Sequence, residues 1–297
     1  MIGILANGTA AGFKRNEQWF REGLTKGGIE IGRNVSIVTA FTEGRADMIP
    51  ALAADLVARK VALIATTGDT ATKVAKSASS TIPIVFSLGT DPVAQGLVTS
   101  LNRPGGNLTG VTTLNFELGQ KRIEVLHEML PKGAGFALLF YSPSSFAADA
   151  IREANDAAQR LGREMTVVGA RNVEEVEAAL AAIAARRVGG LVIGADAFFN
   201  NTAPRLAALV TQHRLPAIYA TREFALAGGL VSYGTDLKDL FRQQGHYAAR
   251  VLRGERPADL PVQQAAKIEM IVNLKTATAL GLTVPQHLLA RADEVIE

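Results

Sequence analysis

Short apolar runs alternate with longer amphipathic segments along the first part of the chain. The apolar runs lie at residues 2–6, 34–39, 61–65 and 84–86. Between them, as in the segment 47–60, apolar residues recur at the spacing of one helix face. This alternation predicts parallel βα units in a doubly wound α/β sheet.

The same pattern restarts in the middle of the chain. Further strand-like runs lie at residues 135–140, 164–169, 190–193 and 217–219, with helical patterns between them. Two successive arrays predict two similar Rossmann-like lobes with parallel sheets. The last third does not add a third array. It supplies one strand, one helix (237–252), a final strand (268–272) and two short helices.

These leftover elements are accommodated if the chain crosses between the lobes three times, near Thr113, Ser232 and Val262. Lobe 1 is then predicted to comprise residues 1–113 and 233–261, and lobe 2 residues 114–232 and 262–297. Three crossings form a hinge, which suits closure on a ligand.

Composition narrows the class of protein. A chain of 297 residues is long enough for two domains. Its content of 48% hydrophobic and 20% charged residues is typical of globular proteins. The net charge of +3 is too small and too scattered to indicate nucleic acid as a partner. The sequence has no cysteine, which excludes disulfides, thiolate metal sites and cysteine nucleophiles. No run of 18 apolar residues occurs, so no bilayer-spanning segment is expected.

Polar loops follow three strands of lobe 1, at the sheet edge where open α/β sheets bind ligands. The candidate ligand-binding residues there are Asn7, Gly8, Thr67, Gly68, Asp69, Thr70, Ser87, Gly89, Thr90 and Asp91. The loop 67–70 leads directly into a helix, so its N–H groups, hydroxyls and helix dipole indicate a carboxylate site. The equally weighted alternative is that Asp69 or Thr70 only caps the helix.

Asp91 precedes Pro92 and has two interpretations. One is an Asx turn that opens a short helix, and the other is a hydrogen-bond acceptor on the pocket rim. The structural interpretation is favoured for Asp91 and the functional one for residues 87–90. The turn at residues 104–107 is expected to lead the chain into the first crossing.

Lobe 2 offers an aromatic wall and two acids at its strand ends. The candidates are Tyr141, Asp196, Phe198 and Glu223, with Tyr233 from the second crossing. A ligand amino group requires a carboxylate partner, and Asp196 and Glu223 are the two choices. The alternatives are that Asp196 starts a helix, that Glu223 pairs with Arg222 or is solvated, and that both aromatic residues belong to the core or rim.

Several enzyme signatures are missing from the sequence. It contains no G-x-S-x-G elbow, no phosphate-binding G-x-x-x-x-G-K-[ST] loop, no H-E-x-x-H motif and no G-x-G-x-x-G after the first strand. No pair of its histidines has metal-ligand spacing. The sequence therefore indicates binding without catalysis, and neither a cofactor nor a metal is expected.

Most of the chain carries segments with a recognisable pattern. They lie at residues 50–57, 81–86, 91–98, 101–111, 216–219, 228–234, 257–262 and 273–285. In these segments the chain resembles the substrate-binding proteins of bacterial ABC importers, in a family with tryptophan- and phenylalanine-binding members. The resemblance implies a type I periplasmic-binding-protein fold with the ligand in the cleft between the lobes. It also implies a membrane permease as partner, and export to the periplasm with a signal peptide that this sequence lacks.

In amino-acid binders of this fold, loops matching 67–70 and 87–90 hold the ligand carboxylate. Positions matching Tyr141, Asp196 and Glu223 contact the amino group or side chain. The expected function is thus that of a receptor that closes on a small carboxylate-bearing ligand, with an amino acid, possibly aromatic, as the lead. The rivals are a cytoplasmic α/β enzyme or a ligand-sensing module acting on a nucleotide or sugar.

Overall fold

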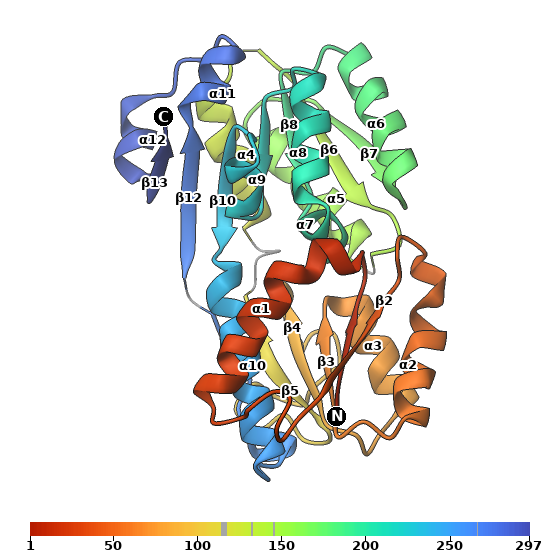
Figure 1. Ribbon diagram of the computed structural model, residues 1–297. Helices are drawn as coiled ribbons and strands as arrows, with labels where there is room; N and C mark the ends of the chain where they lie inside the picture. Colours follow the sequence, from red (N-terminus) through yellow and green to blue (C-terminus); the bar gives the residue numbers. More distant parts are fainter. Residues whose placement is uncertain (114–117, 132, 145, 266) are drawn as a thin grey trace. The chain divides into compact units, whose positions relative to one another are not determined.

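The chain folds into two compact units. The computed structural model describes residues 1–113, 118–131, 133–144, 146–265 and 267–297 (Figure 1). Unit 1 comprises Met1–Leu114 and Leu237–Lys267, and unit 2 comprises Asn115–Asp236 and Ile268–Glu297. The chain therefore passes between the units three times.

Two of these passages lie later in the chain than the sequence predicted. Strand β10 (Val231–Thr235) continues its ladder with β12 (Ile268–Asn273) to the pair Thr235–Ile268. Strand β11 (Gln263–Gln264) pairs with β5 of unit 1. Residues 233–236 therefore belong to unit 2 and residues 262–267 to unit 1, because backbone hydrogen bonding carries each strand past the expected boundary. The predicted first boundary adjoins residues 114–117, which lie outside the described residues.

Unit 1 is built on a six-stranded sheet in the order β11-β5-β4-β3-β1-β2, with every pair parallel. Its remaining strands are β1 (Ile2–Ala6), β2 (Ile37–Phe41), β3 (Leu63–Thr67), β4 (Ile84–Leu88) and β5 (Leu108–Thr112). Because β1 lies between β2 and β3, the strand order reverses at β1. The predicted parallel α/β array is present here.

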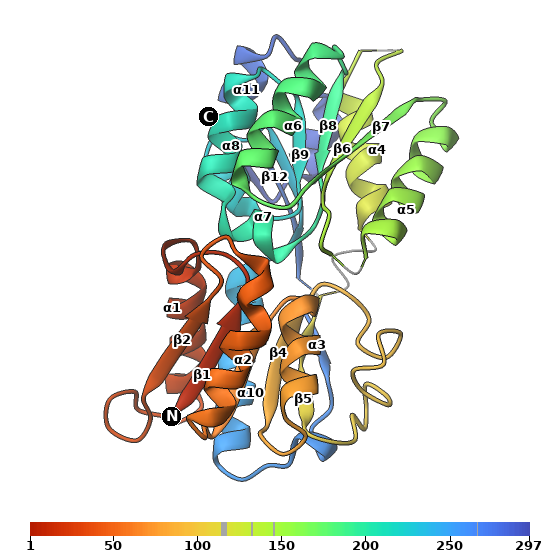
Figure 2. The same cartoon turned by 90° about the vertical axis from the view of Figure 1, so that its right-hand side faces the viewer.

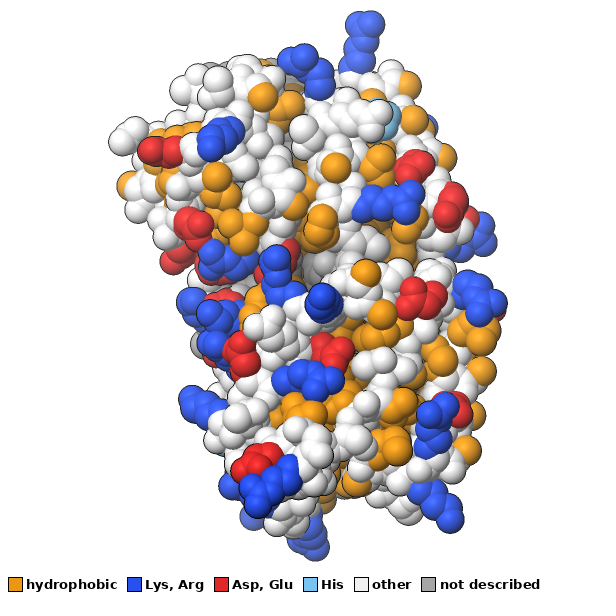
Figure 3. Space-filling model, in the orientation of Figure 1, with side chains coloured by type: hydrophobic (Ala, Val, Ile, Leu, Met, Phe, Trp, Pro, Cys, Tyr) orange, Lys and Arg blue, Asp and Glu red, His pale blue; other side chains and the backbone are white. Residues whose placement is uncertain are grey.

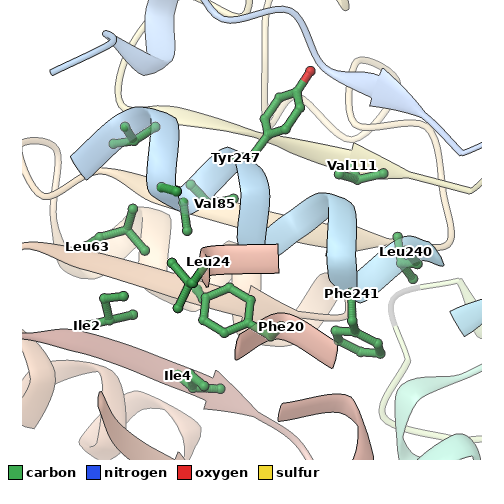
Figure 4. Packing of buried hydrophobic residues seen from close by; sticks show 14 of the residues in the cluster. Ile2, Ile4, Phe20, Leu24, Leu63, Val85, Val111, Leu240, Phe241 and Tyr247 are labelled. Carbon is green, nitrogen blue, oxygen red and sulfur yellow. The ribbon is translucent and has the colours of Figure 1, made fainter. Parts of the chain in front are cut away.

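Helices cover both faces of this sheet. Helices α1 (Ala10–Lys26) and α10 (Leu237–Leu252) share one apolar cluster with the sheet, in which Phe20, Leu24 and Phe241 meet (Figure 4). Helices α2 (Ile49–Ala58) and α3 (Asp69–Ala78) share another. A Cβ atom on Gly23 would lie 2.1 Å from the carbonyl oxygen of Arg242, so glycine allows α1 and α10 to pack closely. Two short 3₁₀ helices complete the unit, η1 (Ala46–Met48) and η2 (Pro257–Asp259).

Unit 2 contains a seven-stranded sheet in the order β13-β12-β10-β9-β8-β6-β7. Its other strands are β6 (Phe136–Tyr141), β7 (Met165–Ala170), β8 (Gly190–Ile193), β9 (Ala217–Tyr219) and β13 (Glu294–Ile296). The predicted parallel array is present here too, and one pair departs from it, since β10 and β12 are antiparallel. The chain leaves unit 2 after β10 and returns into the neighbouring strand, so that strand must run in the opposite direction.

The helices of unit 2 also lie on both faces of its sheet (Figure 2). Helices α4 (Gly119–Met129), α5 (Ala147–Arg160), α11 (Leu274–Ala279) and α12 (Gln286–Arg291) contribute to one apolar cluster. The others are α6 (Val173–Ala185), α7 (Ala197–Asn201), α8 (Ala203–Gln212) and α9 (Arg222–Leu226). Within the described part of the chain, no helix combines the length and apolar character needed to cross a bilayer.

Candidate functional site

Each sheet has one edge where polar loops gather. In unit 1, Ala6 is in register with Thr67, and Thr67 is in register with Ser87, so the carboxyl ends of β1, β3 and β4 are neighbours. The strand order reverses at β1 in unit 1 and at β6 in unit 2. Loops diverge at such reversal points and leave a crevice, which is where open α/β sheets bind ligands.

The first loop of unit 1 is held by residues that follow β2. The Thr42 hydroxyl donates to Asn7 Oδ1 at 2.7 Å, and the Gly8 N–H donates to Thr42 Oγ1 at 3.0 Å. The backbone N–H of Glu43 donates to the Gly8 carbonyl at 2.9 Å. The φ of Gly8 is 114°, a conformation that favours glycine. The loop after β2 was not among the predicted site residues, although a polar loop at a strand end was a usable signal.

The loop that leads into α3 already contains a carboxylate. Gly68 is the N-cap residue with φ 82°, and Asp69 is the first residue of the helix, so neither Asp69 nor Thr70 is the cap. The Thr90 hydroxyl donates to Asp69 Oδ1. Burial raises the pKa of Asp69, while the Thr90 hydrogen bond and the charge of Lys73 act in the opposite direction. A ligand carboxylate placed here would face a like charge.

The loop after β4 is tied to both of its neighbouring strands. The Ser87 hydroxyl donates to Thr67 Oγ1 at 3.3 Å. The Thr112 hydroxyl donates to the Thr90 carbonyl at 2.6 Å, and the Thr113 N–H donates to the Leu88 carbonyl at 2.9 Å. Gly89 lies half-buried between these anchors. Thr113, which was predicted to lie at the first crossing, and its neighbour Thr112 therefore also shape the candidate site.

A buried glutamine forms hydrogen bonds to the two strands from which these loops start. Gln244 of α10 donates through Nε2 to the carbonyls of Thr66, at 2.9 Å, and Val85, at 3.0 Å. Both carbonyls belong to the β3–β4 pair, just before the loops begin. The sequence did not indicate this residue, because a glutamine in a helical pattern has no distinguishing local signal.

The Asx turn expected at Asp91 is present, but the helix expected after it is not. The Val93 N–H donates to Asp91 Oδ1 at 2.8 Å. The residues after Pro92 form consecutive turns, and Gly96 adopts φ 63°. A left-handed residue interrupts helical hydrogen bonding, so the segment remains a loop that Asp91 stabilises.

Aromatic residues connect two strand ends of unit 2. The rings of Tyr141 and Phe198 stack with centroids 4.8 Å apart and an interplanar angle of 21°. Phe199 packs against Phe198 at 5.4 Å. Asp196 is the N-cap of α7 and accepts a hydrogen bond from the Phe198 N–H at 2.8 Å. The structure thus brings these three predicted residues together, and it gives Asp196 the helix-starting role that was its alternative interpretation.

The acid Glu223 lies in the first turn of α9, where it is half-buried. Its neighbour Arg222 forms ion pairs with Glu269 on β12, at 2.9 Å, and with Glu294 on β13. The side chain of Glu269 is only 4% exposed. Arg222, the expected partner of Glu223, therefore pairs with carboxylates that are distant in sequence, because β12 and β13 belong to the same sheet.

The structure also reveals a buried cation that the sequence analysis missed. Arg122 lies in the first turn of α4 and donates through Nη1 to the Tyr233 carbonyl at 3.3 Å. Burial lowers the pKa of Arg122 to about 10, while Tyr233 and Glu153 act in the opposite direction. Arg122 and Glu153 line a cavity of about 30 Å³ together with Gly194 and Ala195 after β8. In sequence Arg122 looks like an ordinary surface residue of an amphipathic helix.

Among the described residues, no group of three or more histidine, cysteine, aspartate or glutamate side chains is arranged to hold a metal ion. On the face drawn in Figure 3, basic and acidic side chains are interspersed. Across α1 and α10, for example, Arg242 pairs with Glu22 at 2.5 Å. That face does not offer the single-sign surface that nucleic acid requires.

Residues 2–296 match the family described as ABC transporter substrate binding protein. The chain belongs to this family. The match runs almost from end to end, so both units and all the candidate loops fall inside it. The protein is a substrate-binding protein of this family rather than an enzyme, as the sequence indicated.

Similar proteins have been described in several bacteria. A tyrosine-binding protein of Clostridioides difficile (strain R20291) is 25% identical over 263 residues, which are 89% of this chain and 75% of that protein. An ABC domain from Streptococcus pneumoniae in complex with L-Trp has a TM-score of 0.87 at 24% identity, covering 99% of both chains. A conserved domain protein from Vibrio cholerae has a TM-score of 0.88 at 24% identity, covering 99% of this chain and 98% of that one. These structures confirm the type I periplasmic-binding-protein fold.

Proposed function

We propose that this substrate-binding protein serves an ABC importer in the periplasm and that its ligand is an amino acid with an aromatic side chain. The observation that carries the proposal is that both sheets end in polar loops where their strand order reverses, in a chain of a substrate-binding family. The tyrosine-binding relative and the L-Trp complex support an aromatic amino acid.

The proposed ligand-contacting set is drawn from both units. It comprises Asn7, Gly8, Thr67, Gly68, Asp69, Thr70, Ser87, Gly89, Thr90 and Asp91 of unit 1, and Tyr141, Asp196, Phe198, Glu223 and Tyr233 of unit 2. Hydroxyl and backbone groups of unit 1 suit the polar end of an amino acid. The stacked rings of Tyr141 and Phe198 suit an aromatic side chain.

The proposed mechanism is ligand-driven selection of one conformation. A ligand that contacts residues of both units stabilises the conformation in which those contacts coexist. The membrane permease of the importer then recognises this conformation, and the ligand passes to it. Since such a receptor performs no covalent chemistry, this mechanism requires neither a catalytic group nor a cofactor.

A thermal-shift screen of the amino acids followed by calorimetry tests this proposal. At a ligand concentration of 100 times Kd, binding stabilises the folded state by about 2.7 kcal/mol, which gives a clear rise in melting temperature. Tyrosine, tryptophan or phenylalanine should produce the largest rise. Tyr141→Ala should reduce the affinity, whereas Arg205→Gln, an exposed substitution on α8, should not. If sugars or nucleotides bind and no amino acid does, the proposal is wrong.

Loss of transport tests the importer role separately. In the bacterium that encodes this protein, deletion of its gene should strongly reduce uptake of the amino acid identified in the screen. Reintroduction of the parent chain should restore uptake, and the Tyr141→Ala variant should restore it only partly. Unchanged uptake after deletion would contradict the importer role while leaving the binding result intact.

A further inference from the structure

One serine at the candidate edge of unit 1 is held only weakly by its protein partners. The Ser87 hydroxyl, near the carboxyl end of β4, donates to the Thr66 carbonyl at 3.4 Å and to Thr67 Oγ1 at 3.3 Å. Most O–H···O hydrogen bonds in proteins are about 2.5–3.0 Å long. Neither acceptor therefore binds the hydroxyl proton strongly, and a ligand that offers a better acceptor can take it.

Other hydroxyls at the same edge form shorter hydrogen bonds. The Thr72 hydroxyl donates to the Gly68 carbonyl at 2.8 Å, and the Thr112 hydroxyl donates to the Thr90 carbonyl at 2.6 Å. Turning either hydroxyl toward a ligand would break a good hydrogen bond that shapes a loop. The Ser87 hydroxyl differs from these two because it can change its acceptor with little loss.

The Thr66 carbonyl is a poor acceptor for Ser87 because a closer donor already uses it. Gln244 Nε2 donates to this carbonyl at 2.9 Å and to the Val85 carbonyl at 3.0 Å, both usual lengths for an N–H···O bond. Thr66 also belongs to the β3–β4 ladder, and a carbonyl oxygen has only two lone pairs. Gln244 is 2% exposed, so any effect that it has on a ligand passes through its neighbours.

We propose that Gln244 is a positioning residue of the ligand site, which keeps the Ser87 hydroxyl available to an acceptor atom of the amino-acid ligand by occupying the Thr66 carbonyl. This inference rests on the proposed function, which includes Ser87 among the ligand contacts. It involves residues of unit 1 alone. Without the Gln244 amide, the hydroxyl turns to the vacated carbonyl, and the ligand must break that bond before it can bind.

A double-mutant cycle measured by calorimetry tests the proposal with the amino acid selected by the screen. The cycle compares the parent chain, Gln244→Met, Ser87→Ala and the double variant. Methionine keeps the length of the side chain and removes its donor. Each single substitution should weaken binding about threefold to tenfold, the range of one hydrogen bond. The double variant should bind no more weakly than Ser87→Ala, because both substitutions act through the same hydroxyl.

A Gln244 that only stabilises the two strands predicts a different result. The losses in affinity would then add in the double variant, or the melting temperature of Gln244→Met would fall while its affinity stayed at the parent value. Either result overturns the inference, as does an unchanged affinity in Ser87→Ala.

The neighbouring glutamine of α10 supplies a matched control. Gln243 Nε2 donates to Asp239 of the same helix. Gln243→Met therefore removes the same atoms from the same helix without affecting β3 or β4, and it should leave the affinity unchanged. A loss equal to that of Gln244→Met would overturn the inference.

NMR of the parent chain decides the matter if Gln244→Met fails to fold. Ligand binding draws the Ser87 hydroxyl away from the Thr66 carbonyl, so the hydrogen bond from Gln244 loses its competitor and strengthens. The side-chain amide protons of Gln244 should shift downfield when the amino acid is added to the parent chain, and they should not do so in Ser87→Ala. Equal shifts in both proteins, or no shift in the parent, overturn this inference alone. Failure of every amino acid to bind overturns the proposed function itself.

Discussion

The two candidate edges share a topology but differ in chemistry. Each lies at the end of a largely parallel sheet whose strand order reverses once, at β1 in unit 1 and at β6 in unit 2. In unit 1 the loops are connected by short hydroxyl hydrogen bonds, such as those of Thr42 and Thr112. In unit 2 they are connected by stacked rings and by the ion pairs of Arg222. Topology fixes where loops gather, and the side chains decide what the loops can bind.

Because of this difference, substitutions at the two edges are expected to have different effects on the stability of the protein and on ligand binding. A buried aromatic ring contributes several kcal/mol to stability, whereas one intramolecular hydrogen bond contributes about 1 kcal/mol. We therefore expect substitutions at the edge of unit 2 to lower stability more than those in unit 1. Substitutions in unit 1 are expected to act chiefly on binding and on its pH dependence.

The largest expected effect is that of Phe198→Ala. Removing a buried ring that stacks on Tyr141 and packs on Phe199 should lower the free energy of unfolding by about 3 kcal/mol or more, because a cavity remains. Urea denaturation followed by circular dichroism measures this change. Phe198→Leu retains most of the apolar volume and should cost clearly less. A loss below about 1 kcal/mol for the alanine variant would show that the aromatic cluster does not stabilise this edge.

The next effect is that of Arg222→Met. This substitution removes the guanidinium that pairs with Glu269, whose side chain is almost fully buried, and we expect a loss of about 2 kcal/mol. Arg205→Met, which removes an exposed ion pair with Glu177, should cost less than about 0.5 kcal/mol. The same denaturation experiment measures both variants. Equal losses would mean that burial of Glu269 does not distinguish the two pairs.

Thr90→Val should have a smaller effect on stability, about 1 kcal/mol, because it removes one hydroxyl hydrogen bond to Asp69. Since that bond lowers the pKa of Asp69, the variant should raise this pKa further. NMR titration of the Asp69 carboxyl carbon measures the shift. An unchanged titration would indicate that Thr90 does not reach the carboxylate in solution.

The smallest expected change in stability is that of Asp69→Asn, and its sign depends on pH. Burial raises the folded-state pKa of Asp69 above 3.8, so the folded state retains this proton where the unfolded state has released it. The ionised group therefore destabilises the fold as pH rises through the folded-state pKa. The asparagine variant should be slightly more stable than the parent at neutral pH, and the difference should vanish as pH falls below 3.8. Melting curves across this pH range measure the difference in stability between the variant and the parent. An asparagine variant that is less stable than the parent at neutral pH would contradict the raised pKa of Asp69.

The sequence by itself determined the α/β architecture with two mostly parallel sheets. Alternation of apolar runs and amphipathic segments is a local property that follows from the periods of strands and helices, so it predicted two βα arrays and the loops at their strand ends. The Asx turn at Asp91 could likewise be read from adjacent residues, because its hydrogen bond spans only two positions.

Only the tertiary structure decided which side chains meet. Arg122, Gln244 and Thr42 acquire their roles through partners 111, 178 and 35 residues away, respectively. The antiparallel β12 and the Arg222–Glu269 pair likewise depend on how the chain re-enters unit 2. Hydrophobic periodicity is short-ranged, whereas the burial of a charge and the choice of its partner are set by elements that are brought together only by folding.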